Sequence, residues 1–249
     1  MFIKVLSWNI LASEFIKKSY YPTLNFNLLN DRNKRIKIII DNLMKEDPDI
    51  ILLQEVMVKE YYYLKKYLKK NYYFSVLTNV NWNGNEKTES GNITLYKKKH
   101  FYKKNNTNNL LYNNKIYGSY IIIQLLNDKN NKLLHLFNVH LDDLSWQTRL
   151  KQINTIRPQL EKNKYCILGG DLNQKYNKNS QIYNISNFTV SNIKNMTYYI
   201  ENNMNIDNIL LKNIIFVKNN MVDELNFSKK ELFEKYGSDH LPVIITLEI

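Results

Sequence analysis

The sequence contains few of the residues that build disulfides, zinc sites and membrane spans. Its 249 residues include a single cysteine, Cys166, which excludes an intramolecular disulfide and a cysteine-based zinc site. So few cysteines are typical of a reducing compartment, and we expect an intracellular, cytoplasmic or nuclear protein. No run of roughly 18 apolar residues is present, so no membrane span is expected. Residues 1–9 follow a strand pattern and lack the basic head and long apolar body of a secretion signal.

Glycine and proline are also scarce. The chain has six glycines and four prolines, which form no flexible linker, and it shows no internal repeats. The length fits one large domain or two small ones. With no linker to separate two units, we predict a single domain over residues 1–249. A hydrophobic content of 44% is enough for a large core.

Acidic residues are outnumbered by basic ones, which gives a net charge of +12 and a pI of about 9.4. This excess favours a polyanionic partner: nucleic acid, a phosphorylated small molecule or an anionic membrane surface. A composition rich in Lys, Asn, Ile and Tyr could also produce the charge without a function. Lysines 65, 66, 69 and 70 and the run Lys97–Lys99 are candidates for steering a nucleic-acid backbone, or they form a solvated surface.

Apolar patterning predicts alternating strands and helices early in the chain and antiparallel strand pairs in its middle. A helix is predicted after Asp31, its N-cap, and Ile50–Leu53 is typical of a strand buried on both faces. Two further helices are predicted, over 57–70 and over 144–161, and Pro158 is expected to kink or shorten the latter. Further strands are predicted over residues 2–8, 72–78, 91–96, 117–126, 132–141, 166–168, 206–211, 214–217 and 243–249. The expected fold class is α/β: a four-layer sandwich of two face-to-face mixed β-sheets flanked by helices.

The stretch Tyr165–Asn173 places polar groups at the end of a predicted strand. Its apolar part stops at Gly169–Gly170, and Asp171 and Asn173 follow. Residues i and i+2 of an extended chain point the same way, so both side chains can reach one ligand. A glycine pair before an aspartate is also an ordinary turn.

Other predicted strands end in the same manner, and oxygen-bearing side chains predominate among the polar residues found there. Such oxygens suit Mg²⁺, with Mn²⁺ as the alternative, better than Zn²⁺, for which the chain has too few histidines and cysteines. The polar residues at or beside strand ends are Asn9, Glu55, His140, Asp171, Asn173, Asp207, Asp239 and His240.

This set of residues can hydrolyse a phosphate ester. We expect Asp171 to take a proton from the attacking water and Asn173 to orient that water or a phosphate oxygen. His140 and His240 would donate to the phosphate, with Asp207 orienting His240. Each residue alone also has an ordinary structural interpretation, such as a turn residue, a core histidine or a helix cap. Their joint occurrence supports catalysis.

The order of these residues resembles the endonuclease/exonuclease/phosphatase superfamily, which includes deoxyribonuclease I and the abasic-site endonucleases. The matching motifs are Trp8–Ile10, Leu53–Val56, Asn138–Leu141, Gly170–Asn173, Ile206–Ile209 and Ser238–Pro242. The resemblance implies a β-sandwich flanked by helices. It also implies metal binding by Asn9, Glu55 and Asp239, and catalysis or phosphate contact by His140, Asp171, Asn173, Asp207 and His240.

Within the superfamily, the chain looks closest to the deadenylase-like branch that includes nocturnin. A long irregular insert precedes Arg32–Arg35, the stretch Gly91–Lys97 fits the branch's next strand, and Arg149 and Gln152 also fit. The chain departs from the branch in its short length and in Asn208, where a tyrosine is often found. The tyrosyl-DNA phosphodiesterase branch shares several of the same motifs and is a close competitor.

We therefore predict a Mg²⁺-dependent phosphodiesterase, expected as a monomer, that acts on nucleic acid. Cleavage of single-stranded RNA from its 3′ end is favoured over action on DNA. Trp82 and Trp146 could stack on bases or could serve packing. The alternatives are a DNA-repair phosphodiesterase, tyrosyl-DNA phosphodiesterase-like or abasic-site endonuclease-like, and a catalytically silent polyanion-binding module. The presence of every predicted ligand argues against the silent module.

Overall fold

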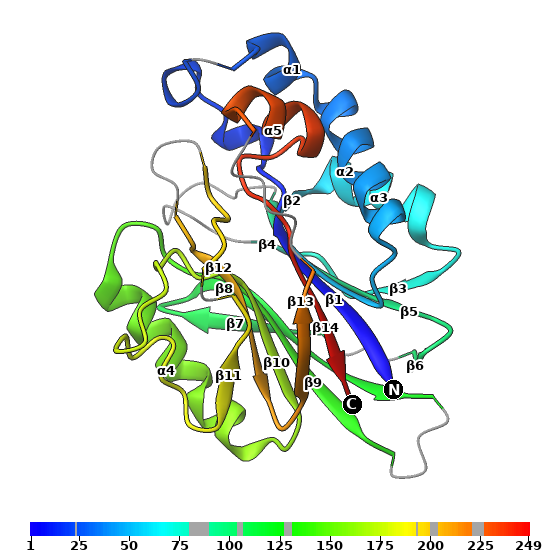
Figure 1. Ribbon diagram of the computed structural model, residues 1–249, viewed down its shortest axis with the longest axis vertical. Helices are drawn as coiled ribbons and strands as arrows, with labels where there is room; N and C mark the ends of the chain where they lie inside the picture. The colour runs from blue at the N-terminus through cyan, green and yellow to red at the C-terminus, as the bar shows by residue number, and fades with distance from the viewer. Residues whose placement is uncertain are drawn as a thin grey trace.

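The computed structural model describes residues 1–22, 24–79, 90–103, 107–126, 131–192, 194–199, 204–220 and 227–249. The strands within these ranges form two mixed seven-stranded sheets (Figure 1). In the first sheet β1 runs parallel to β2, and all other strand pairs of this sheet are antiparallel. The order across this sheet is β13 (Ile215–Asn219), β14 (Val243–Glu248), β1 (Phe2–Asn9), β2 (Ile50–Met57), β5 (Ser90–Lys97) and β3 (Tyr72–Phe74), with β4 (Thr78–Asn79) paired to β5.

The second sheet also contains one parallel pair, β9 with β10. The order across it is β11 (Phe188–Val190), β12 (Asp207–Lys212), β10 (Cys166–Asp171), β9 (Leu133–His140), β8 (Lys115–Leu125) and β6 (Phe101–Tyr102), with β7 (Thr107–Tyr112) paired to β8. The apolar residues between the two sheets include Val5, Leu52, Ile123, Ile167 and Ile209, all essentially inaccessible to solvent.

Helices cover the outer faces of both sheets (Figure 1). The helices α2 (Arg32–Glu46), α3 (Val58–Leu68) and α5 (Lys229–Tyr236) pack on the first sheet together with α1 (Phe26–Asn30), and α4 (Trp146–Lys162) packs on the second. Two 3-10 turns, η1 (Ser13–Phe15) and η2 (Lys18–Tyr20), precede α1. The predicted four-layer α/β-sandwich is confirmed. None of the described helices has the length and apolar character needed to cross a membrane.

Some elements differ from their predictions. The strand expected over 72–78 is split into β3 and β4, and patterning predicted neither β7 nor α5. Pro158 does not shorten α4, which continues to Lys162. Pro158 has no backbone N–H to donate to the carbonyl of Asn154, four residues earlier in the helix. Both residues are exposed, so water can donate to that carbonyl instead.

One end of the layer between the sheets is polar. On three strands, the face that points between the sheets changes from an apolar to a polar residue toward this end. The change is from Val5 to Asn9 on β1, from Ile167 to Asp171 on β10, and from Ile209 to Asp207 on β12. Asp171 and Asp207 are direct partners in the antiparallel β10–β12 pairing. The carboxyl ends of the parallel strands and the start of β12 therefore bring polar side chains to one edge.

Candidate active site

Glu55 lies in a bulge of β2. The pairing of β2 with β5 shifts between Leu53 and Val56, and Glu55 has a φ of 58°, which is uncommon for a residue with a side chain. Its carboxylate accepts hydrogen bonds from the side-chain nitrogen of Asn9 at 2.8 Å and from the backbone nitrogen of Ala12 at 2.8 Å. Burial raises the pKa of Glu55, partly opposed by nearby His140.

Asp171 is the hub of the site. Its Oδ1 accepts from the backbone nitrogen of Asn173 at 2.8 Å, and its Oδ2 accepts from Nδ2 of Asn9 at 3.1 Å. The same Oδ2 lies 3.6 Å from Nε2 of His140. Burial, assisted by the charge of Asp207, raises the pKa of Asp171.

Gly170 is required just before this hub. Its φ is +151°, and a Cβ at this position would lie 1.8 Å from the carbonyl oxygen of Val139 on the adjacent strand. Gly170, the second glycine of the predicted pair, therefore allows β9 and β10 to approach closely. This approach brings His140 beside Asp171, which is its partner in the parallel pairing.

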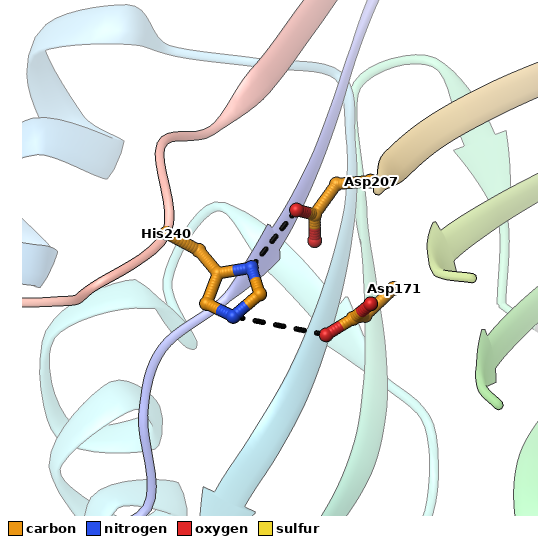
Figure 2. Close-up of side chains that lie close together, drawn as sticks. All are labelled: Asp171, Asp207 and His240. Atoms are coloured by element: carbon orange, nitrogen blue, oxygen red, sulfur yellow. Dashed lines mark hydrogen bonds and ion pairs between the residues drawn. The ribbon is translucent and has the colours of Figure 1, made fainter. Parts of the chain in front are cut away.

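His240 is bonded to Asp207 and faces Asp171 (Figure 2). Its Nδ1 lies 2.8 Å from Oδ2 of Asp207, and its Nε2 lies 3.8 Å from Oδ2 of Asp171. Burial alone would lower the pKa of His240, but the charges of Asp207 and Asp171 outweigh it and raise that pKa well above 6.5. These three residues are close enough to hold a metal. Because Nδ1 of His240 is hydrogen-bonded to Asp207, we interpret these three residues as a histidine held in place by a carboxylate, and not as a metal site.

Asp239 follows α5 and is fixed by a residue from the N-terminal part of the chain. The hydroxyl of Tyr21 donates to its Oδ2 at 2.9 Å. Burial and the charge of Asp239 raise the pKa of Tyr21, so this hydroxyl stays protonated and remains a donor. The other oxygen, Oδ1, is buried and has no hydrogen-bond partner among the described residues.

The backbone beside Asp239 is held by buried side chains. Arg35 donates to the carbonyl of Gly237 at 2.9 Å and to that of Leu11 at 2.5 Å. Trp8 donates to the carbonyl of His240 at 2.9 Å. The sequence predicted no role for Tyr21, and Arg35 stood out only as part of the branch resemblance. The signal for Arg35 was its place on the apolar face of α2, beside Ile36.

The predicted residues meet in one cleft with a volume of about 670 Å³. Asn9, Glu55, His140, Asp171, Asn173, Asp239 and His240 line it, and Asp207 is attached to it through His240. Trp146 lines a different hollow, and Trp82 lies outside the described residues. Lys97 is buried in ion pairs with Asp47 and Asp49 at 2.9 and 3.0 Å, so the prediction that it steers a nucleic-acid backbone is wrong.

The donor set of the cleft fits a divalent cation. Glu55, Asp171 and Asp239 line it, and Lys17 is the one basic side chain of Lys or Arg type on its described lining. Even with His240 protonated, the carboxylates of the cleft outnumber the positive charges beside them, which is unfavourable unless a cation joins them. The unpaired Oδ1 of Asp239 has the free lone pairs of a ligand. The oxygen of Asn9 instead accepts from the backbone nitrogen of Leu11 at 3.0 Å.

The chain belongs to the Endonuclease/Exonuclease/phosphatase family, whose model matches residues 6–240. The predicted superfamily is thereby confirmed. A search of curated proteins finds no match.

Solved structures share the fold over nearly the whole chain. ANGEL2, described as a 2′,3′-cyclic phosphatase and crystallised with adenosine-2′,3′-vanadate, has a TM-score of 0.80 and 13% identity, covering 99% of this chain and 95% of its own. A humanized TDP2 from D. rerio has a TM-score of 0.72 and 16% identity, with coverages of 100% and 99%. The human nocturnin catalytic domain with bound sulfate has a TM-score of 0.69 and 16% identity, with coverages of 99% and 93%. At such identities the likeness shows the fold alone.

Proposed function

We propose that this protein is a metal-dependent phosphodiesterase that hydrolyses nucleic acid, with single-stranded RNA cleaved from its 3′ end as the favoured substrate. The observation that carries the proposal is the meeting of Glu55, Asp171, Asp239 and two histidines in one cleft. Such a set of oxygen and imidazole groups can bind a phosphate, activate water and stabilise the charge of the transition state.

Asp171 is the proposed general base. Its raised pKa brings the carboxylate closer to the value at which it can accept a proton from water at neutral pH. Hydrogen bonds from Asn9 and from the backbone of Asn173 fix both of its oxygens. Asn173 itself has a φ of 48° and donates its side-chain amide to the carbonyl of Leu141, which holds it at the wall of the cleft.

His240 is the proposed electrostatic partner of the phosphate. Asp207 holds it through Nδ1, so its Nε2 proton is directed toward Asp171 and the cleft. A protonated imidazole placed there would donate to a phosphate oxygen as negative charge builds on it. His140, whose Nε2 lies 3.6 Å from Oδ2 of Asp171, would supply a second donor.

Glu55 and Asp239 are the proposed metal ligands, with Asn9 beside them as a holder of Glu55. Mg²⁺ fits their oxygens, and Mn²⁺ is the alternative. Such an ion would neutralise negative charge on the phosphate and on the leaving oxygen.

The net charge of +12 supports a polyanionic substrate. ANGEL2 and nocturnin are among the structural neighbours of this chain, and ANGEL2 was crystallised with an adenosine derivative. A related TDP2 structure contains single-strand DNA product, so DNA is the competing substrate.

A substrate panel tests the proposal. The protein is incubated with labelled single-stranded RNA, RNA ending in a 2′,3′-cyclic phosphate, single-stranded DNA, abasic duplex DNA and tyrosyl-linked DNA, each with Mg²⁺ or with EDTA. We expect metal-dependent shortening of the RNA from its 3′ end. Preferential processing of either repair substrate would favour the DNA phosphodiesterase. Tight binding of all nucleic acids without product would mean a silent binding module.

A further inference from the structure

The rim of the cleft differs chemically from its floor. The floor carries carboxylates and imidazoles, whereas Phe15, Tyr20, Leu144 and Tyr198 line the cleft with aromatic or apolar surface. Leu144 is 89% exposed and Tyr20 is 50% exposed, so neither is needed to fill the core. Hydrolysis of a phosphate requires none of these groups. They suit a substrate that presents a flat apolar group beside its phosphate.

The part of the rim contributed by residues 13–22 is anchored to the catalytic floor. Tyr21 is buried and donates to Asp239, and the ring of Tyr20 lies edge-on to that of Tyr21 at 6.5 Å. At the other end of the segment, Oγ of Ser13 accepts from Nε of Arg32 at 3.3 Å. The exposed ring of Tyr20 therefore has a defined position relative to the proposed metal ligand.

A positive charge accompanies the exposed ring. Nζ of Lys17 lies 5.5 Å from the centre of the Tyr20 ring, and both residues line the cleft. An aromatic face next to a cation matches the repeating unit of a nucleic-acid strand, in which each base is accompanied by a phosphate. The carboxylates on the floor of the cleft offer no surface on which a base could stack.

We propose that Phe15, Lys17 and Tyr20 form a subsite for the nucleotide adjoining the scissile phosphate. Tyr20 would stack on the base of that nucleotide, and Lys17 would form an ion pair with its phosphate. This inference rests on the proposed function and specifies how that site recognises a nucleic-acid strand. Stacking is tolerant of sequence because every base has a π-face. The subsite therefore recognises the presence of a base more strongly than its identity.

The test compares two single-stranded hexamers with the same ribose-phosphate backbone, one carrying its bases and one lacking all of them. The measured quantity is the ratio of kcat/KM for the two hexamers. We expect the wild-type protein to prefer the hexamer with bases, and Tyr20→Ala to lower that preference about tenfold, as the loss of one stacking contact does. Tyr20→Phe, which keeps the ring, should retain the preference.

Tyr67→Ala is the matched control. Tyr67 is 52% exposed on α3 and also has a lysine, Lys66, with its Nζ 5.5 Å from the ring centre, but it does not line the cleft. Its substitution should leave the ratio at the wild-type value. The melting temperature of each variant, followed by circular dichroism, identifies any loss of activity that comes from unfolding.

The possible outcomes separate the two proposals. If the wild-type protein cleaves both hexamers equally, or if Tyr20→Ala keeps the full preference for bases, the subsite is absent while the phosphodiesterase stands. If the wild-type protein cleaves neither hexamer with Mg²⁺ or Mn²⁺, the proposed function fails, and the subsite fails with it.

Discussion

Asp171, the proposed general base, is a buried carboxylate that is unfavourable to the stability of the folded protein. It accepts hydrogen bonds from Asn9 and Asn173 while lying beside Asp207, with which it pairs across β10 and β12. Burial and this neighbouring charge raise the pKa of Asp171, so its ionised form at neutral pH destabilises the folded protein. Its presence is therefore better explained by the proposed reaction than by folding.

Replacing Asp171 with asparagine should separate these two effects. Asp171→Asn retains an oxygen that accepts from the backbone of Asn173 but cannot act as a base. We expect kcat to fall about 10²- to 10⁴-fold, and the melting temperature to stay at or above that of the wild type. Activity assays and thermal unfolding measure the two quantities. Asp41→Asn, an exposed change on α2, is the control. A variant with wild-type kcat would show that another group is the base.

Sequence could identify the residues at strand ends but not every residue that supports them. Asp171, Asp207 and His240 were predictable because a polar residue at or beside the end of an apolar strand lacks a core role. The contact between Tyr21 and Asp239 was not predictable, because the two residues are 218 positions apart and Tyr21 lies in an irregular segment. Only the folded chain shows that this tyrosine reaches the proposed metal ligand.

Strands and helices were predictable where burial imposes a strong pattern. The apolar run Ile50–Leu53 lies in the middle of the first sheet, and Asp31 caps α2 by accepting from the backbone nitrogen of Lys34. The strand β7 was missed because, among the described strands, it pairs with β8 alone, and only one of its six residues is buried. The helix α5 was missed because it is short, although Ser228 and Glu231 form a capping box.

The strand β9 contains a histidine that makes stability depend on pH. His135 is half-buried, and its Nδ1 lies 2.7 Å from the hydroxyl of Tyr120. Burial lowers the pKa of His135 below 6.5 in the folded protein. As the pH falls below about 6.5, the unfolded chain binds a proton that the folded protein resists, so stability decreases until the lowered pKa is reached.

A substitution isolates this effect from the other histidines. Between about pH 7 and pH 5.5, His135→Gln should lose less unfolding free energy than the wild type, because only the wild type loses the contribution of His135. Urea unfolding at both pH values measures the difference. Equal losses in the two proteins would contradict the assigned cause.

The protein as a whole brings together groups from both ends of its sequence. Asn9, Glu55 and Asp239 come from β1, the bulge of β2 and the segment after α5, and Arg35 ties that segment to Leu11. The alternating faces of two packed sheets account for most of this convergence. Because the proposed ligands Glu55 and Asp239 are distant in sequence, they would form a binding site only in the folded chain, and a bound metal should stabilise that chain.

The most direct test is the melting temperature of the wild type, Glu55→Gln and the control Asp41→Asn, each with and without saturating Mg²⁺. At a metal concentration of about 100 times Kd, binding to the folded state alone adds about 2.7 kcal/mol of stability. We predict that Mg²⁺ raises the melting temperature of the wild type and of Asp41→Asn, and leaves that of Glu55→Gln nearly unchanged. No rise in the wild type, or an equal rise in all three proteins, would contradict a metal site built from these buried carboxylates.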